Sequence, residues 1–314
     1  MKLSIIIPCK NEEGNVEELY TKINDVLNKI KYEVIFIDDG STDGTFQKLS
    51  EIYEKDVKHV KVISFSRNFQ KEAAMYAGLT HATGDYTCIV DGDLQQNPKY
   101  LLDMIDFLDN NHDYDEVAMV MKNRTVDSGF MKFCKGIFYK LIDSLSEVHF
   151  ENAASDFRMF RKNVRNAVIS LSEKSRFSKG IFAWVGFNIK YLPYDVEERK
   201  SGKTSFNFKR SLSYALDGIL SFTFKPLKIS ITCGFLTFLA FLIYLIVLLI
   251  RIIGFDAEFM LGHAIILLLL FFFGVQFILI GILGEYIAKI SSEVKNRPVY
   301  IIKEKLGFNK ETIL

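Results

Sequence analysis

The chain is 314 residues long, which is enough for one large hydrophobic core or for two domains. Its 39 basic and 38 acidic residues leave a formal net charge of +1, and this balance argues against nucleic acid or another polyanion as a partner. The four cysteines are scattered, without the close pairs of zinc or redox motifs, which favours a reducing compartment. Because Met1 is followed directly by a strand-like run, we expect no secretory signal peptide.

Apolar runs alternate with helix-like segments in the first part of the chain. The runs are LSIIIP, EVIFID, VKVISF and YTCIVD, and the segments between them cover residues 15–29, 45–53 and 71–83. Nearly continuous apolar strands joined by helices are typical of βαβ units, in which helices cover both faces of a parallel sheet. The sequence therefore predicts an α/β domain with a mostly parallel sheet.

A polar loop follows each of these predicted strands. The loops read PCKNEEGN, DDGSTDGT, SRNFQKE and DGDLQQNP in chain order. Ligands of parallel sheets bind outside the carboxyl ends of the strands, so the four loops together predict a single binding site. Each loop alone is also compatible with ordinary helix capping.

The loop DDGSTDGT has neither the GxGxxG spacing of a dinucleotide site nor a Walker lysine. A nucleotide can still be held by carboxylates that accept from a base N–H or from ribose hydroxyls. Asp38, Asp39 and Asp43 are the candidates, and we interpret Asp39 as a ligand contact. Asp43 could equally cap the helix that is expected to begin near Thr45.

Asp91 and Asp93 end the fourth predicted strand, separated only by Gly92. Side chains two residues apart on a strand project to the same face, so the two carboxylates can converge if the extended conformation persists. Such neighbours raise each other's pKa unless a cation neutralises them, and Mg²⁺ or Mn²⁺ typically takes one or two carboxylates plus substrate phosphates. Gly92 would leave room for the phosphate. The alternative is a solvated turn.

Two long apolar runs predict a transmembrane hairpin. Residues 229–250 contain no charge, and in residues 261–283 the only polar interruptions are His263 and Gln276. Each run of about 22 residues would form about 33 Å of helix, which crosses the hydrocarbon core of a bilayer. The alternative is a pair of helices buried in a soluble core.

Basic residues flank the outer ends of the hairpin. The connector between the two runs carries only Arg251 as a cation, whereas the outer flanks carry Lys225, Lys228, Lys289, Lys295, Arg297, Lys303 and Lys305. By the positive-inside rule, this predicts a multi-pass protein of the cell (inner) membrane, with residues 1–224 and both termini in the cytoplasm. The basic segment 198–210, followed by apolar residues at helical spacing in 211–225, indicates an interfacial helix. A solvated charged face is the alternative there.

These motifs together resemble the family 2 glycosyltransferases of the GT-A fold. More narrowly, they resemble the membrane-bound polyisoprenyl-phosphate glycosyltransferases, the branch that contains bactoprenol glucosyltransferases and dolichol-phosphate mannose synthases. The motifs that carry the resemblance run nearly the whole length: IIIPCKNEEGNV, VIFIDDGSTDGT, FSRNFQKEAAMYAGL, ATGDYTCIVDGDLQQNP, SDFRMFRK, RKSGKTSF and GEYIAKISSEVKNRPVY. The resemblance implies a cytoplasmic GT-A domain (1–205), an interfacial juxtamembrane helix (206–228), two transmembrane helices (229–252 and 261–284) and a cytoplasmic C-terminal tail (285–314).

The resemblance also implies roles for individual residues. Asp91 and Asp93 would hold the metal and diphosphate, with Gln95 as a further metal or phosphate contact. The nucleotide pocket would be lined by Pro8, Lys10, Glu12, Asp38 and Asp39. Phosphate contacts would come from Arg124, from Lys179, and from Arg199 and Thr204 of a closing loop.

The chain departs from the family pattern at two positions. Gln70 stands where glycine is usual, which puts close backbone approach there in doubt. Ser205 stands where lysine usually follows the hydroxyl residue, and Lys203 could replace that phosphate contact. The D-F-R motif at 156–158 is closer to the glucosyltransferase branch, which favours a UDP-sugar donor.

The implied reaction is inverting transfer of a hexose, with UDP-glucose as the favoured donor, to a polyprenyl phosphate such as undecaprenyl phosphate. That acceptor is already ionised at neutral pH, so Asp91, Asp93, Asp156 and Arg199 would act by positioning and charge and not as a strong base. Asp156 would orient the sugar or acceptor, or else serve as a helix cap or arginine partner. UDP-N-acetylglucosamine and GDP-mannose remain alternative donors.

Other functions fit the sequence less well. A processive polysaccharide synthase normally carries a Q-x-x-R-W motif, and no such motif surrounds Trp184, the single tryptophan. A membrane scaffold that binds sugar nucleotides without turnover is the non-enzyme alternative. A homotetramer is expected only by analogy with the bactoprenol branch.

Overall fold

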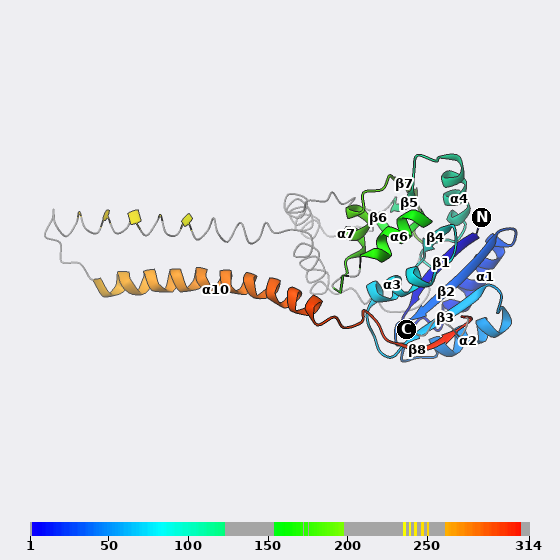
Figure 1. Ribbon diagram of the computed structural model, residues 1–314, viewed down its shortest axis with the longest axis horizontal. Helices are drawn as coiled ribbons and strands as arrows, with labels where there is room; N and C mark the ends of the chain where they lie inside the picture. The colour runs from blue at the N-terminus through cyan, green and yellow to red at the C-terminus, as the bar shows by residue number, and fades with distance from the viewer. Residues whose placement is uncertain are drawn as a thin grey trace.

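The computed structural model describes residues 2–122, 154–171, 173–174, 176–197 and 261–308, together with single helical positions between 235 and 250. The described residues form a sheet of eight strands with helices on both faces, from which one long helix extends (Figure 1). The strand order is β7–β5–β6–β4–β1–β2–β3–β8. The chain order reverses between β1 and β4, which is the position where ligands bind in open parallel sheets.

The sheet is mostly parallel, as the sequence predicts. The strands that share one direction are β1 (Lys2–Cys9), β2 (Lys31–Asp38), β3 (Val60–Phe65), β4 (Tyr86–Ile89), β5 (Glu116–Met121) and β7 (Ile189–Tyr194). β6 (Ala154–Arg161) and β8 (Ile302–Leu306) run in the opposite direction.

Helices cover both faces because the inner strands are apolar on both sides. Ile5 and Ile7 pack into one core with helices α1 (Val16–Leu27), α2 (Thr45–Lys55) and α4 (Tyr100–Asn110). Ile6 packs into the opposite core with α3 (Lys71–His81), α6 (Lys162–Ser170) and α7 (Ser178–Trp184), as Figure 1 shows. The predicted α/β architecture is therefore confirmed.

The end of β4 differs from the sequence-based expectation. The strand stops at Ile89, and Gly92 and Asp93 lie in a turn. Leu94 then adopts a φ of 63°, a left-handed conformation that no extended strand contains. Strand alternation therefore does not place Asp91 and Asp93 on one face, and their proximity has to come from the turn.

Helix α10 (Leu261–Val294) contains the second predicted membrane span and continues beyond it. Within the described residues, one stretch, Phe271–Val294, is long and apolar enough to cross a membrane. The predicted first span, 229–252, is described only at single positions, which are helical and exposed, such as Ile243 and Ile246. The hairpin therefore stays a prediction, and the predicted interfacial helix over 206–228 lies outside the described residues.

The chain returns to the sheet after α10. β8 pairs antiparallel with β3 at the edge of the sheet, with Val62 opposite Leu306. Next to this pairing, the ring of Tyr300 stacks on Phe65 with centroids 5.1 Å apart. The segment expected as a C-terminal tail thus contributes a strand to the sheet, which the sequence did not predict.

Candidate active site

The carboxyl ends of β1, β2 and β4 meet at one edge of the sheet. Cys9, the last residue of β1, lies opposite Asp38, the last residue of β2, and β1 also pairs with β4. Burial raises the pKa of the Cys9 thiol, and the charges of Glu12, Asp38 and Asp91 raise it further. Carboxylates from the ends of β1, β2 and β4 therefore lie around this buried thiol.

Asp91 is held by two side chains. Its Oδ1 lies 2.6 Å from Nζ of Lys71, and its Oδ2 accepts a hydrogen bond of 3.0 Å from Nε2 of Gln96. The backbone N–H of Asp91 donates to Oε1 of the same glutamine at 2.9 Å. Burial raises the pKa of Asp91, Lys71 opposes this shift, and Asp156 and Asp93 add to it. The orientation of this carboxylate is therefore set by the protein.

Asp156 faces Asp91 across the same ammonium group. Its Oδ2 lies 2.7 Å from Nζ of Lys71. Burial alone would raise the pKa of Asp156, but Lys71, and then Lys179 of α7, hold this pKa well below its usual range. Burial alone would lower the pKa of Lys71, whereas the two carboxylates raise it above its usual range. Asp156 lies within β6, so the alternative role as a helix cap does not apply.

Asp93 lies close to the same corner. The backbone N–H of Gln95 donates to its Oδ1 at 3.2 Å, which stabilises the turn after β4. Burial raises the pKa of Tyr194, and the charges of Asp91, Asp93 and Asp156 add to the shift. The three carboxylates therefore share one neighbourhood, which we call the acidic corner.

Gly92 allows a close approach within the protein. A Cβ at this position would lie 3.3 Å from both the carbonyl oxygen of Pro8 and Sγ of Cys9. That is tighter than an ordinary contact, so glycine allows the turn to pack against the end of β1. The expectation that Gly92 also leaves room for a phosphate stays a prediction.

The acidic corner suits a divalent cation that is shared with a ligand. In the part of the chain that the structure describes, no group of three or more His, Cys, Asp or Glu side chains forms a metal cage. Asp91 and Asp93 nevertheless supply carboxylate oxygens, and Mg²⁺ or Mn²⁺ commonly combines one or two of these with substrate phosphates. The carboxylate oxygens of Asp91 and Asp93 therefore fit such an ion, which would share Asp91 with Lys71 and Gln96. Gln95, the third predicted ligand, is half-buried in the same turn.

Asp38 and Asp39 are both buried at the end of β2, but they differ in their partners. Asp38 accepts from the N–H of Ser41 at 3.0 Å and from Oγ of Ser64 at 2.9 Å. Both of its oxygens are therefore engaged by the protein. Asp39 accepts from the N–H of Phe69 at 2.6 Å and from the N–H of Gln70, and burial raises its pKa. The protein therefore holds both carboxylates at this edge of the sheet, and the nucleotide contact of Asp39 stays a prediction.

The other residues predicted for the nucleotide pocket surround this edge. Lys10 is exposed, and its charge lowers the pKa of Asp39 against the larger effect of burial. The Oε2 of Glu12 accepts from Nδ2 of Asn15 at 2.6 Å. Pro8 is half-buried at the end of β1. The structure therefore brings these predicted residues to the same edge as Asp39.

Asp43 serves the fold. Its Oδ1 accepts from the N–H of Thr45 at 3.1 Å and from Oγ1 of the same threonine at 2.6 Å. Thr45 is the first residue of α2. Asp43 lies one residue before Gly44, the N-cap of α2, so it stabilises the start of the helix without being its N-cap.

The backbone conformation of Gln70 explains why glycine is usual at this position. Its φ and ψ are 76° and 162°, a region that is essentially restricted to glycine. It precedes α3, and its carbonyl oxygen accepts from the N–H groups of Ala73 and Ala74. Lys71 follows directly, so the strained residue sets the position of the lysine in the acidic corner.

Four predicted residues cannot be placed, because Arg124, Arg199, Lys203 and Thr204 lie outside the described residues. Sequence reasoning also missed Lys71 and Gln96. Lys71 sits in the polar loop SRNFQKE after β3, so the convergence of loops at one sheet edge was the available signal. Nothing in the sequence pairs it with Asp156.

The fold and the acidic corner together define a GT-A type of α/β protein. The structure resembles the glucosyl-3-phosphoglycerate synthase of Mycobacterium tuberculosis, solved in complex with Mn²⁺, uridine diphosphate and phosphoglyceric acid, with a TM-score of 0.51. The match covers 70% of this chain and 76% of that one, at 17% sequence identity. At this identity the likeness establishes the fold alone.

Sequence comparison then places the chain in a family. Residues 4–168 match the model of glycosyl transferase family 2. The chain is 38% identical, over 98% of its length, to the putative glycosyltransferase CsbB of Bacillus subtilis, of which 93% is covered. It is 34% identical, over 97% of its length, to the bactoprenol glucosyl transferase of Shigella phage SfII, of which 98% is covered. The protein belongs to glycosyl transferase family 2, and the resemblance drawn from its motifs is confirmed.

Proposed function

We propose that the protein is an inverting glycosyltransferase that moves a hexose from a nucleoside-diphosphate sugar, with UDP-glucose as the first candidate, to a polyprenyl phosphate. Undecaprenyl phosphate is the acceptor to test first. The observation that carries the proposal is the acidic corner, in which Asp91 and Asp156 share Lys71 at the carboxyl end of the sheet. The bactoprenol glucosyl transferase, of matching length, supports a lipid phosphate as the acceptor.

The donor would bind across the ends of β1, β2 and β4. Asp39 would accept from the nucleoside, with Lys10, Glu12 and Pro8 along the same edge. Asp91 and Asp93, with Gln95, would hold a divalent cation, which when bound would neutralise charge on the diphosphate. Mn²⁺ and uridine diphosphate are the natural first probes, because the mycobacterial synthase of the same fold was solved with both.

Catalysis would rest on positioning and charge. A phosphate monoester has its second pKa near 6, so the acceptor needs little help from a general base. The difficulty is to bring one phosphate towards a departing diphosphate, and Lys71 and Lys179 supply positive charge beside Asp156. Asp156 would then orient the sugar or the acceptor. Attack in line with departure of the diphosphate would invert the anomeric centre.

Further phosphate contacts are proposed for residues outside the described part of the chain. Arg124 would contact a phosphate, and Arg199 and Thr204, with Lys203, would close over the diphosphate. Their placement in the sequence, on basic segments after β5 and β7, is compatible with a loop that folds over the carboxyl edge.

The membrane would bring the acceptor to the acidic corner. Helix α10 carries exposed apolar side chains, such as Ile278 at 65% and Leu283 at 50% exposure, along the stretch that could cross a bilayer. We propose that this helix and residues 229–252 form a hairpin with both termini in the cytoplasm, and that the protein is a multi-pass protein of the cell membrane. A homotetramer stays a proposal by analogy with the family branch.

The test is a transfer assay with the full chain in phospholipid nanodiscs that contain undecaprenyl phosphate. Labelled UDP-glucose, UDP-N-acetylglucosamine and GDP-mannose are offered separately, with Mn²⁺ or with a chelator. We expect a labelled lipid product from UDP-glucose that disappears with the chelator. Transfer from UDP-N-acetylglucosamine would correct the sugar alone, and transfer from GDP-mannose would correct the sugar and the nucleotide. Donor binding without any lipid-linked product would favour the scaffold, and an elongating polymer would favour a processive synthase.

A further inference from the structure

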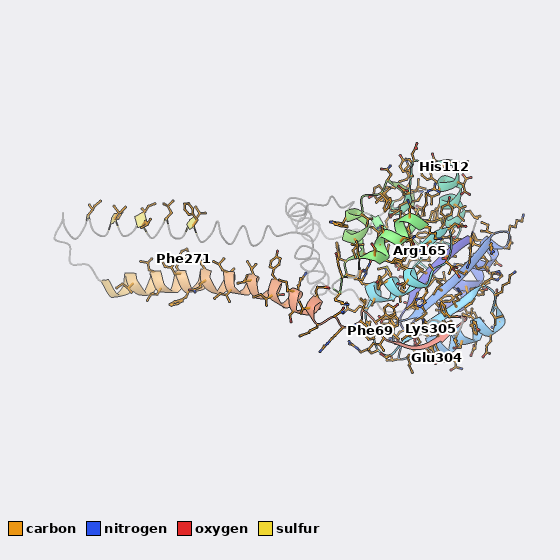
Figure 2. The ribbon with its side chains drawn as sticks, viewed as in Figure 1. Phe69, His112, Arg165, Phe271, Glu304 and Lys305 are labelled. Atoms are coloured by element: carbon orange, nitrogen blue, oxygen red, sulfur yellow. The ribbon has the colours of Figure 1, made fainter. Side chains whose placement is uncertain are left out.

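A basic pocket lies where the C-terminal end of α10 meets the sheet domain. Its cavity of about 280 Å³ is lined by the loop after β3, by Lys174, by the end of α10 and by the segment that leads to β8. Phe69, on the wall of this pocket, lies at the junction between the long helix and the domain (Figure 2). The charged residues that line it are Arg67, Lys174, Lys295 and Arg297.

The pocket is electropositive. Among the described residues that line it, four are cations and none is acidic. Two carboxylates lie beside it. Oε1 of Glu293 accepts from the backbone N–H of Lys174 at 2.7 Å, and the Glu293 charge raises the pKa of Glu173, after the larger effect of burial. Even if both acids are counted against the four cations, a net charge of +2 remains.

The cations remain available to a ligand. Within the described ranges, no salt bridge joins Arg67, Lys295 or Arg297 to another residue. The guanidinium of Arg67 lies over the ring of Phe69 at 4.3 Å, which leaves its N–H groups at the edge of the pocket. Nζ of Lys174 donates to Oδ1 of Asn296 at 3.1 Å, a bond to a neutral acceptor that leaves its charge uncompensated.

The position of the pocket points to a lipid. Lys295 and Arg297 follow immediately after Phe271–Val294, the stretch that is apolar enough to cross a membrane. The last turns of α10 still expose Ile290 at 61% and Val294 at 78%. Basic residues next to the cytoplasmic end of a span attract anionic headgroups, and basic pockets beside spans bind them.

The basic pocket is separate from the acidic corner. None of Asp91, Asp93 and Asp156 lines it, so a phosphate held there is not at the carboxylates proposed for transfer. The two sites are nevertheless connected through one loop. The backbone N–H of Phe69, on the pocket wall, donates to Oδ1 of Asp39 at 2.6 Å, and Lys71 follows two residues later.

We propose that the basic pocket binds the phosphate of an anionic phospholipid headgroup, and thereby orders the loop after β3, which contacts Asp39 through Phe69 and leads to Lys71. The proposal rests on the proposed membrane location of α10 but not on the transfer reaction. A polyprenyl phosphate also carries a phosphate, but its phosphate has to reach the acidic corner in order to react, and the phospholipid need not.

The test is thermal unfolding of the full chain in an uncharged detergent, without sugar donor, during titration with dihexanoyl phosphatidylglycerol. Dihexanoyl phosphatidylcholine, inorganic phosphate and undecaprenyl phosphate are titrated in parallel. A ligand that binds only the folded state raises the melting temperature with its concentration. The test variant combines Lys295→Gln with Arg297→Gln. The matched control combines Lys29→Gln with Lys58→Gln, which removes two exposed cations before β2 and β3, whereas Arg67 and Phe69 of the pocket follow β3.

We expect phosphatidylglycerol to stabilise the wild type more than phosphatidylcholine does, with saturation. The test variant should weaken its apparent affinity roughly 30-fold, because each basic residue near an anionic headgroup contributes about 1 kcal/mol. The control variant should keep the wild-type affinity. If the test variant does not fold, Arg67→Gln repeats the comparison from the opposite wall of the pocket.

The other outcomes overturn the proposal. Equal affinity in the two double variants would place the phospholipid elsewhere. Equal stabilisation by inorganic phosphate would show a free-anion site, and equal stabilisation by phosphatidylcholine would show no preference for charge. If stabilisation by undecaprenyl phosphate depends on Lys295 and Arg297 and stabilisation by phosphatidylglycerol does not, the pocket binds the acceptor. Because no transfer is measured, failure here is distinguishable from failure of the proposed reaction.

Discussion

Asp91 and Asp156 share one ammonium group: Nζ of Lys71 lies 2.6 Å from Oδ1 of the first and 2.7 Å from Oδ2 of the second. The two carboxylates come from different strand ends, one after β4 and one within β6. Their side chains are 28% and 22% exposed, so neither is fully solvated. Lys71 therefore compensates the negative charge of the two carboxylates. When a donor and a metal ion bind, we expect the ion to share this part.

Lys71→Gln should show how far the folded state depends on the lysine that Asp91 and Asp156 share. Two partly buried carboxylates would lose their shared cation, and we expect a loss of about 1 kcal/mol of folding free energy after allowance for the 41% exposure of the lysine. Millimolar Mn²⁺ should restore much of this loss, because the ion would supply the missing charge. The measurement is the melting temperature with and without Mn²⁺. Lys48→Gln, which removes an exposed pair with Glu51, is the control. An identical response to Mn²⁺ in both variants would contradict the expectation.

Gln70→Gly should stabilise the protein. Glutamine here has a φ of 76° and a ψ of 162°, a conformation that costs a residue with a side chain on the order of 1–3 kcal/mol. Relief of this strain stabilises the folded state, but glycine also increases the entropy of the unfolded chain, which offsets part of the effect. We therefore expect a net gain of about 1 kcal/mol. Gln47→Gly, in the first turn of α2, should instead lose stability, by up to about 1 kcal/mol. Denaturant midpoints of both variants decide, and a destabilised Gln70→Gly would show that the side chain contributes more than the strain.

Glu33 should make stability depend on acid pH. Burial alone would raise its pKa, but hydrogen bonds from Lys2, Ser4, Lys61 and Thr83 lower the pKa to about 2 from 4.5. As the pH falls, the unfolded state binds a proton near 4.5 while the folded carboxylate stays ionised until about 2. Stability is therefore present above pH 4.5 and is lost as the pH falls towards 2. The contribution is on the order of 3 kcal/mol.

The check is the free energy of unfolding at pH 7 and at pH 3. Wild-type protein should lose stability between the two values, and Glu33→Gln should be less stable at pH 7 and lose less on acidification. The exposed Glu54→Gln serves as the control. If Glu33→Gln keeps the wild-type pH dependence, another carboxyl group is responsible.

Strand β8 should be needed for the integrity of the sheet. Deletion of residues 301–314 would leave the edge of β3 unpaired, and unpaired edges promote association between chains. We expect a lower melting temperature and concentration-dependent light scattering. Deletion of residues 309–314 alone, which keeps β8, should leave both unchanged. Equal behaviour of the two truncations would mean that the pairing with β3 contributes nothing.

The main part of the sheet could be predicted from sequence because its strands are apolar on both faces. β1, β2 and β3 coincide with the predicted runs within a few residues, and α2 and α3 begin at the predicted residues 45 and 71. β8 escaped prediction because IKEKL is short and charged, and it follows a membrane-like helix. The segment is held as a strand by its pairing with β3, which is distant in sequence.

The acidic corner could be predicted only in part. Asp91, Asp93 and Asp39 were found because they directly follow apolar strand-like runs, and polar loops at the ends of parallel strands commonly form one site. The turn at Asp93 was not, because Leu94 gives no sign of its left-handed conformation. Lys71 was missed because its contacts join three separate strand ends, and local patterns carry no information about such a meeting.

The central claim is that Asp91 and Asp93 hold a divalent cation together with a nucleoside diphosphate. Binding of Mn²⁺ to the full chain, followed by electron paramagnetic resonance with and without uridine diphosphate, tests it most directly. We predict that uridine diphosphate tightens Mn²⁺ binding in the wild type and in Asp43→Asn, whose carboxylate stabilises the start of α2, and that Asp93→Asn abolishes this effect. If Asp93→Asn binds Mn²⁺ and uridine diphosphate as the wild type does, the claim is wrong.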